Sequence, residues 1–251
     1  MSAAWVLLLA LAAPVDDGAR ATRFAAAVEA ARHASSTLEC EAAARGFEAL
    51  LDDTFDSADV RFNAGNAWLA AGRVGHAIAQ YESAARARPR DAAIAANLGL
   101  ARQRAGIAAP AAEPLDSIVF WQRWLSYREK ATLALVWLGV GFLALCVASW
   151  TASRGWRRVG LVLLGLLAVF SVALVRDVIE HEFTSRAIVA APGVIARKGA
   201  ADEFAPAFNE ALPEGTPVRV LESRPEWARI ELDGGLDGWV RSSAIALIGP
   251  R

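Results

Sequence analysis

Residues 131–150 read ATLALVWLGVGFLALCVASW, twenty consecutive residues without a charged side chain. At a rise of about 1.5 Å per residue, a helix of this length spans about 30 Å, the thickness of the hydrocarbon core of a bilayer. Residues 159–175, VGLVLLGLLAVFSVALV, form a second apolar stretch near the short end of the spanning range. The rival interpretation is a pair of buried core helices, but uncharged runs this long are uncommon in soluble proteins. The sequence therefore predicts a hairpin of two transmembrane helices.

The turn between the two stretches is short and contains Arg154, Arg157 and Arg158. Short arginine-rich loops usually stay in the cytoplasm, although basic residues before the first stretch compete with this signal. Residues 1–13 are too short to span a bilayer but are typical of a signal peptide, apart from the missing basic start. The sequence predicts a multi-pass protein of the bacterial inner membrane with both flanking domains in the periplasm. It leaves open whether residues 1–13 are cleaved.

The composition narrows the possible functions. Of 251 residues, 55% are hydrophobic, above the usual ~45–50%, and the net charge of −1 gives no reason to expect nucleic acid as a partner. Cys40 and Cys146 lie in separate regions, and no Cys/His cluster has metal-ligand spacing, so we expect neither a metal nor another cofactor. Because GxSxG and GxxxxGKS/T motifs are also absent, the sequence favours a protein that is not an enzyme.

Residues 58–91, ADVRFNAGNAWLAAGRVGHAIAQYESAARARPRD, resemble one tetratricopeptide repeat (TPR), a pair of antiparallel helices. The matching positions are Gly65, Trp68, Ala77, Tyr81, Ala84 and Pro89. Small residues are expected where the two helices cross closely, aromatic residues around that crossing, and proline at the end of the second helix. Weaker units on either side extend the predicted array over residues 20–105. Because the array has fewer than the three repeats that usually stand alone, we expect it to need a supporting helix or partner.

The first helices of TPR units line a groove that binds peptides. Asn63 and Asn97 occupy the same position one repeat apart, and Asn66 follows Asn63 by one helical turn. The side-chain amides of these three residues are therefore candidates for holding a peptide backbone or a carboxylate. The alternative is that Asn63 and Asn97 are consensus residues that satisfy the repeat's own helices.

Residues 106–130 combine a Pro/Ala-rich linker with a predicted juxtamembrane amphipathic helix, for which a simple lead-in to the first transmembrane helix is an equal alternative. From residue 186 to 248 the pattern changes to short β-type runs separated by glycine-containing turns. The predicted runs are 187–191, 218–223, 227–232 and 238–248. About 60 residues of short strands favour a small, all-β, SH3-like barrel.

Residues 212–240, LPEGTPVRVLESRPEWARIELDGGLDGWV, resemble a bacterial SH3 (SH3b) domain. Such domains often bind cell-wall peptides or proteins. The resemblance makes Trp227 and Trp239 the candidate ligand contacts. The alternative for both is packing in the core or at the rim of a small barrel.

The order of parts is similar to that of the BatE-like family of aerotolerance-operon proteins: a signal-like segment, a short TPR array, a surface helix, two membrane helices with a basic turn, and an SH3b domain. The resemblance implies a non-enzymatic membrane scaffold in an envelope or oxidative-stress complex. The implied partners are von Willebrand A domain membrane proteins and a MoxR-type AAA+ ATPase. The alternative function is a tether or sensor that binds peptidoglycan through the SH3b domain.

Overall fold

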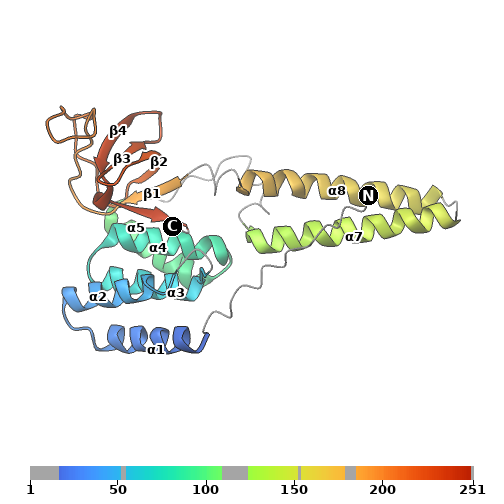
Figure 1. The fold of residues 1–251 in the computed structure, drawn as a ribbon, viewed down its shortest axis with the longest axis horizontal. Coiled ribbons are helices and arrows are strands. Elements are labelled where there is room, and N and C mark those ends of the chain that lie inside the picture. Colours follow the sequence, from blue (N-terminus) through green and yellow to red (C-terminus); the bar gives the residue numbers. More distant parts are fainter. Residues whose placement is uncertain (1–16, 52–54, 109–123, 152–153, 179–184, 250–251) are drawn as a thin grey trace, which may run out of the picture.

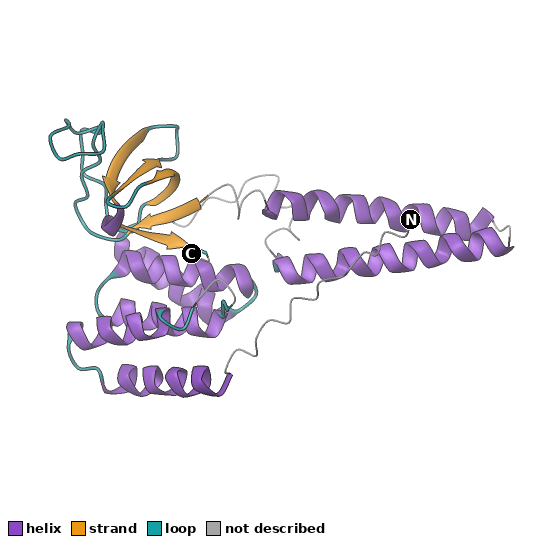
Figure 2. Cartoon of the chain, in the orientation of Figure 1, coloured by secondary structure: helices purple, strands orange, loops and turns teal. Residues whose placement is uncertain are grey.

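The computed structural model describes residues 17–51, 55–108, 124–151, 154–178 and 185–249. The predicted segment 1–13 and most of the predicted linker and amphipathic helix at 106–130 lie outside these residues. The described chain forms a body of short helices and one sheet, from which two long helices extend side by side (Figure 1). Figure 2 shows the sheet on one side of the stacked helices.

Five consecutive helices of the body, the helical array, pack each on the next along the chain. They are α1 (Asp17–His33), α2 (Thr37–Glu48), α3 (Ala58–Ala70), α4 (Val74–Ala87) and α5 (Ala92–Ala105). Local sequence sets their ends. Ser36 forms a capping box with Glu39, Gly72 takes the positive φ of 76° that the α3–α4 turn requires, and the Asp91 side chain caps α5. Pro89 lies just beyond the last residue of α4.

The core of the helical array is densest where α3 crosses α4. A Cβ atom added at Gly65 would lie 2.6 Å from the Tyr81 ring, so this crossing requires glycine. Ala77 and Ala84 are fully buried on α4, and Trp68 of α3 is 3% exposed. The small and aromatic residues therefore pack around one close helix crossing, which fixes the angle between α3 and α4.

The two long helices, here called the arm, are α7 (Tyr127–Thr151) and α8 (Arg154–Val178). Both are longer than the predicted runs 131–150 and 159–175, because a helix continues beyond its apolar stretch until it is capped. Ser126 and Glu129 form a capping box at the start of α7: the Ser126 N–H donates to Glu129 Oε2 at 2.8 Å. By length and composition, both helices could cross a membrane.

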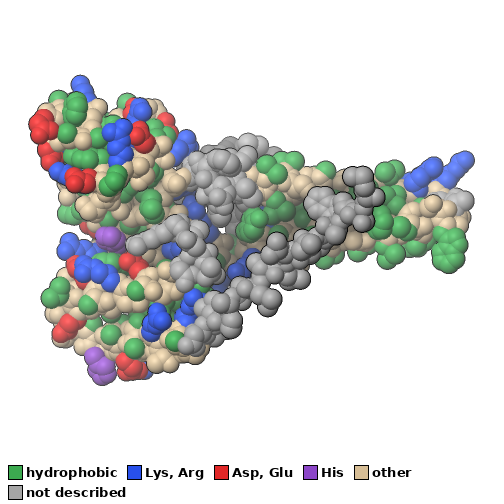
Figure 3. Space-filling view, in the orientation of Figure 1, with side chains coloured by type: hydrophobic (Ala, Val, Ile, Leu, Met, Phe, Trp, Pro, Cys, Tyr) green, Lys and Arg blue, Asp and Glu red, His purple; other side chains and the backbone are tan. Residues whose placement is uncertain are grey.

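Small residues of the arm face inward and large apolar residues face outward. Ala134, Gly141, Ala144 and Ala148 of α7 are buried, and a Cβ at Gly160 of α8 would lie 2.7 Å from Leu145. The exposed large side chains include Leu135, Phe142, Leu143, Leu161, Val162 and Val172. A helix in a soluble core has the opposite distribution, whereas close packing through small residues is typical of membrane helices. Hydrophobic side chains are spread along the visible part of the arm, and Lys/Arg side chains gather at its far tip (Figure 3).

The second part of the body, the sheet module (residues 185–249), holds one antiparallel sheet of order β4-β3-β2-β1-β5. Its strands are β1 (Ser185–Val189), β2 (Pro217–Ser223), β3 (Trp227–Glu231), β4 (Asp237–Arg241) and β5 (Ile245–Ile248). The prediction of one continuous run at 238–248 is wrong. A 3-10 turn at Ser242–Ala244 divides it into β4 and β5, which form opposite edges of the sheet.

The sheet module packs directly on α4, through β1 and β5. Ile188 and Ile248 belong to the same buried cluster as Ile78 and Tyr81 of α4. Parts of the chain on either side of the arm therefore share one hydrophobic core. At the start of the arm, Arg90 stacks 4.5 Å above Trp124 and pairs with Glu129, which ties the α4–α5 turn to the arm.

Candidate functional site

The structure brings two of the three predicted groove asparagines together. Asn66 on α3 and Asn97 on α5 are half-buried, and Asn97 Nδ2 donates to Asn66 Oδ1 at 2.8 Å. The Tyr81 hydroxyl on α4 donates to the same oxygen at 2.7 Å. One amide oxygen thus accepts from two neighbouring helices and links all three.

These hydrogen bonds determine which atoms of the Asn66 and Asn97 side chains remain available to a ligand. Asn66 Oδ1 already accepts two hydrogen bonds, so the group that Asn66 can still offer to a ligand is the donor Nδ2. Among the described residues, no hydrogen bond from this nitrogen is seen. Asn97 uses an N–H for Asn66, which leaves its Oδ1 as an acceptor. A donor beside an acceptor is complementary to a peptide group, whereas a carboxylate needs donors only.

Asn63 does not join this pair. Its Nδ2 donates to the Asp59 carbonyl of its own helix at 2.8 Å. The prediction treated Asn63 and Asn97 as equivalent, but in the structure Asn63 bonds its own backbone while Asn97 reaches a neighbouring helix. All three asparagines therefore bond to groups within the helical array: Asn63 to its own helix, Asn66 to Tyr81 of the same repeat, and Asn97 to Asn66.

Tyr81 holds Asn66 in place through its hydroxyl group. Its side chain is fully buried, and this burial raises its pKa to about 12, against the smaller opposite effects of Asn97 and the Arg104 charge. The hydroxyl therefore stays protonated as a donor at all physiological pH values. The orientation of Asn66 is consequently independent of pH in that range.

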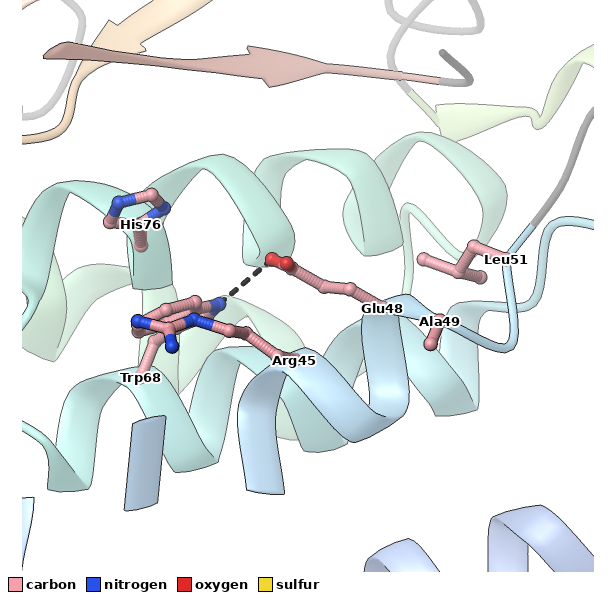
Figure 4. A pocket seen from close by; sticks show the side chains of 6 residues that line it. All are labelled: Arg45, Glu48, Ala49, Leu51, Trp68 and His76. Atoms are coloured by element: carbon pink, nitrogen blue, oxygen red, sulfur yellow. Dashed lines mark hydrogen bonds between the residues drawn. The ribbon is translucent and has the colours of Figure 1, made fainter. Parts of the chain in front are cut away.

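A second cluster, here the junction pocket, lies where α2, α3 and α4 meet, and surrounds a hollow of about 500 Å³. The Trp68 indole stacks on His76 with ring centroids 4.4 Å apart, and its Nε1 donates to Glu48 at 2.8 Å (Figure 4). The Arg45 guanidinium lies 5.8 Å from the Trp68 ring. The hydrogen bond from Trp68 to Glu48 and the stacking of Trp68 on His76 join α2, α3 and α4 across this pocket.

Two titratable residues, one in the junction pocket and one beside it, have shifted pKa values. Burial lowers the pKa of His76, although the nearby carboxylates of Glu48 and Glu214 act in the opposite direction. The hydrogen bond from Arg73 lowers the pKa of Glu41, whose two oxygens pair with Arg73 and Arg45 at 2.6 and 2.9 Å. At neutral pH, His76 is therefore neutral and Glu41 ionised.

Sequence reasoning missed a buried hydrogen-bond chain that starts in this pocket. Glu48 also accepts from Gln80, and Gln80 in turn accepts from Arg61 at 3.3 Å. Arg61 is 4% exposed and pairs with Asp56. Nothing in the repeat pattern distinguishes these polar residues from surface ones. The one sequence signal is the position of Arg61, three and four residues before Ala64 and Gly65, which places it on the buried side of α3.

Trp227 and Trp239 lie on the outer face of the sheet. By strand alternation they share it with Arg229 and Arg241, while Ala228, Ile230 and Val240 point into the core. Guanidinium groups cover both indoles: Arg241 is 4.5 Å from the Trp227 ring, and Arg224 is 4.4 Å from the Trp239 ring. Trp227 is 8% exposed, and a ligand that stacks on either ring would have to displace an arginine.

No family model, no curated protein and no solved structure matches this chain.

Proposed function

We propose that this protein is a non-enzymatic membrane scaffold whose TPR-like helical array holds an extended peptide segment of a partner protein. The supporting observation is the pair Asn66–Asn97, which offers one donor and one acceptor side by side on neighbouring helices. These groups match a backbone amide, so the bound segment is recognised through its main chain as well as its side chains.

The sequence resemblance supplies the wider setting of the proposal. In a BatE-like scaffold, the partners are von Willebrand A domain membrane proteins acting with a MoxR-type AAA+ ATPase. The arm is proposed to anchor the protein in the inner membrane, with its arginine-rich tip (Arg154, Arg157 and Arg158) in the cytoplasm and the body in the periplasm.

Asn66→Asp tests the groove with little disturbance of the fold. Aspartate keeps an oxygen for Tyr81 and Asn97 but replaces the donor Nδ2 by a second acceptor. We expect the full-length variant, purified in detergent, to lose co-purification with the von Willebrand A domain proteins. Asn63→Asp is the matched control, because it introduces the same charge one turn away and should retain the partner. Equal retention by both variants would refute the peptide groove.

The alternative function is peptidoglycan binding through an SH3b-like sheet module. It is favoured by the position of two tryptophans on one outer face of the sheet. The detergent-solubilised full chain should then sediment with purified sacculi, and Trp239→Ala should release it. If the wild-type chain stays in the supernatant, the sheet module is not a cell-wall binder.

A further inference from the structure

The contact between α4 and the sheet module has the character of a protein core. Ile78 of α4 and Ile188 of β1 are at most 1% exposed, and Ile248 of β5 is 7% exposed. These residues pack in the cluster that also contains Trp68 and Tyr81 of the helical array. The array thus completes its hydrophobic core with residues that follow the arm in the chain.

Glycines on both sides allow the backbones to approach closely. A Cβ at Gly75, in the first turn of α4, would overlap the Val189 carbonyl oxygen and lie 2.9 Å from the Ala190 Cα. Gly215 of the sheet module has a φ of +88°, and a Cβ there would lie 2.7 Å from Ile107 and 3.0 Å from Ile78. Neither position tolerates a side chain while the two parts stay together.

Polar contacts at two ends of the interface fix its register. The Gly75 N–H donates to Glu214 Oε1 at 2.7 Å, which places a carboxylate at the N-terminus of α4, where the helix dipole favours it. At the other end the Gly249 N–H donates to Ser83 Oγ at 3.0 Å, and the buried Arg61 donates to the Gly249 carbonyl at 3.0 Å. Arg61 thus links the hydrogen-bond chain of the junction pocket to the end of β5.

We infer that the sheet module is the cap of the helical array, docked on the outer face of α4 of its own chain, and that the array does not persist without it. A short array leaves the apolar outer face of its last complete helix pair exposed, and repeat proteins require such a face to be covered. Here β1 and β5 cover it. The arm is therefore an insertion between two halves of one folded unit, and both its ends leave the membrane on the same side.

The cap also restricts where partners bind. Because β1 and β5 occupy the outer face of α4, that face is closed to a peptide ligand, whereas Asn66 and Asn97 lie on the neighbouring helices α3 and α5. The inference itself does not depend on that ligand, since it concerns only contacts within the chain.

The test uses the full-length chain in detergent, with an affinity tag inserted at the tip of the arm, between Thr151 and Arg154, and a protease recognition sequence between Val178 and Ser185. After immobilisation and cleavage, we expect the fragment that begins at Ser185 to stay on the column, held only by the helical array. Gly75→Leu should release most of it. Gly99→Leu is the matched control, since no atom lies within 4 Å of a Cβ at Gly99, and it should retain the fragment.

Two further experiments make the result unambiguous. Glu214→Ala weakens the same interface from the sheet side without changing the helical array, so increased release by this variant shows that Gly75→Leu does not act by misfolding α4. Cleavage of a mixture of tagged and untagged chains tests for exchange between copies. The inference is wrong if the wild-type fragment washes off, if Gly75→Leu retains it as well as Gly99→Leu, or if the fragment of untagged chains is captured on tagged ones.

Discussion

At the scale of single residues, one glycine sets the geometry of the proposed peptide site. The absence of a side chain at Gly65 lets the Tyr81 ring lie against α3, and from there the Tyr81 hydroxyl orients Asn66. A packing residue therefore determines which atoms of a candidate binding residue face the solvent. We therefore expect a substitution at Gly65 to change the proposed peptide site through the packing of Tyr81, and a substitution at Asn66 to change it directly.

Gly65→Ala should lower the stability of the body. The added methyl group would lie 2.6 Å from the Tyr81 ring and force the α3–α4 crossing apart, a strain of about 1–3 kcal/mol. We expect a lower melting temperature by fluorescence-monitored unfolding of the full chain in detergent. Gly99→Ala, a helical glycine with open space around it, should instead be neutral or stabilise by up to about 1 kcal/mol. Equal destabilisation by both substitutions would contradict this account.

His76 should make stability depend on pH. Because burial holds its folded pKa below the 6.5 of an unperturbed histidine, the unfolded chain takes up the proton first as the pH falls. The contribution of neutral His76 is therefore complete above 6.5 and is lost as the pH drops toward the folded pKa. His76→Phe keeps a ring on Trp68 but cannot bind a proton. We expect its melting temperature to fall less than that of the wild type between about pH 7.5 and 5.5; equal falls would show that His76 contributes nothing.

At the scale of elements, the arm depends on one close crossing. Gly160 lies where a Cβ would be 2.7 Å from Leu145 and 3.3 Å from the Gly141 carbonyl, whereas Gly165 on the same helix has no neighbour within 4 Å. In the proposed transmembrane arm, lipid offers no hydrophobic driving force between helices, so the association of α7 with α8 would rest on this fit. The two glycines are therefore a matched pair for testing it.

Gly160→Leu should separate α7 from α8, while Gly165→Leu should leave them together. The expected loss is about 1–3 kcal/mol for the first substitution, by the cost of overpacking a close contact. It can be measured by SDS-induced unfolding in mixed micelles. The same midpoint for both variants would show that the crossing seen at Gly160 does not hold the arm together.

The whole molecule has a topology that labelling can test. The helical array and the sheet module touch each other. An arm that spans the membrane, as proposed, therefore crosses it an even number of times and has its tip on the opposite side from the body. With Cys40 and Cys146 replaced by serine, single cysteines at Ala93 and Ser223 should both react with an impermeant maleimide in spheroplasts. A cysteine at Arg154 should react only after lysis. If cysteines at positions 93 and 223 differ in labelling, the helical array and the sheet module lie on different sides of the membrane and do not share a core.

Much of the element-level structure could be predicted from local sequence, because it depends on local physics. Two long uncharged runs, a proline after α4 and an Asp-Gly turn before β4 each act within a few residues, and helices or a turn occur at these places. The split of residues 238–248 was missed, because the chain between β4 and β5 contains no glycine or proline to mark the turn at Ser242–Ala244. Among the candidate site residues, the repeat pattern singled out Asn66 and Asn97 but could not distinguish them from Asn63.

The sequence by itself determined where the chain is apolar enough to cross a membrane, where helices give way to strands, and which glycines and prolines end them, because periodicity and turn chemistry are properties of neighbouring residues. Only the tertiary structure decided that Gly75 meets Val189, that Arg61 reaches Gly249, and that the array and the sheet module share one core. Those contacts join residues more than a hundred positions apart, on either side of the arm. No local pattern encodes such a meeting, because it arises from the shapes of two surfaces that exist only once each part has folded.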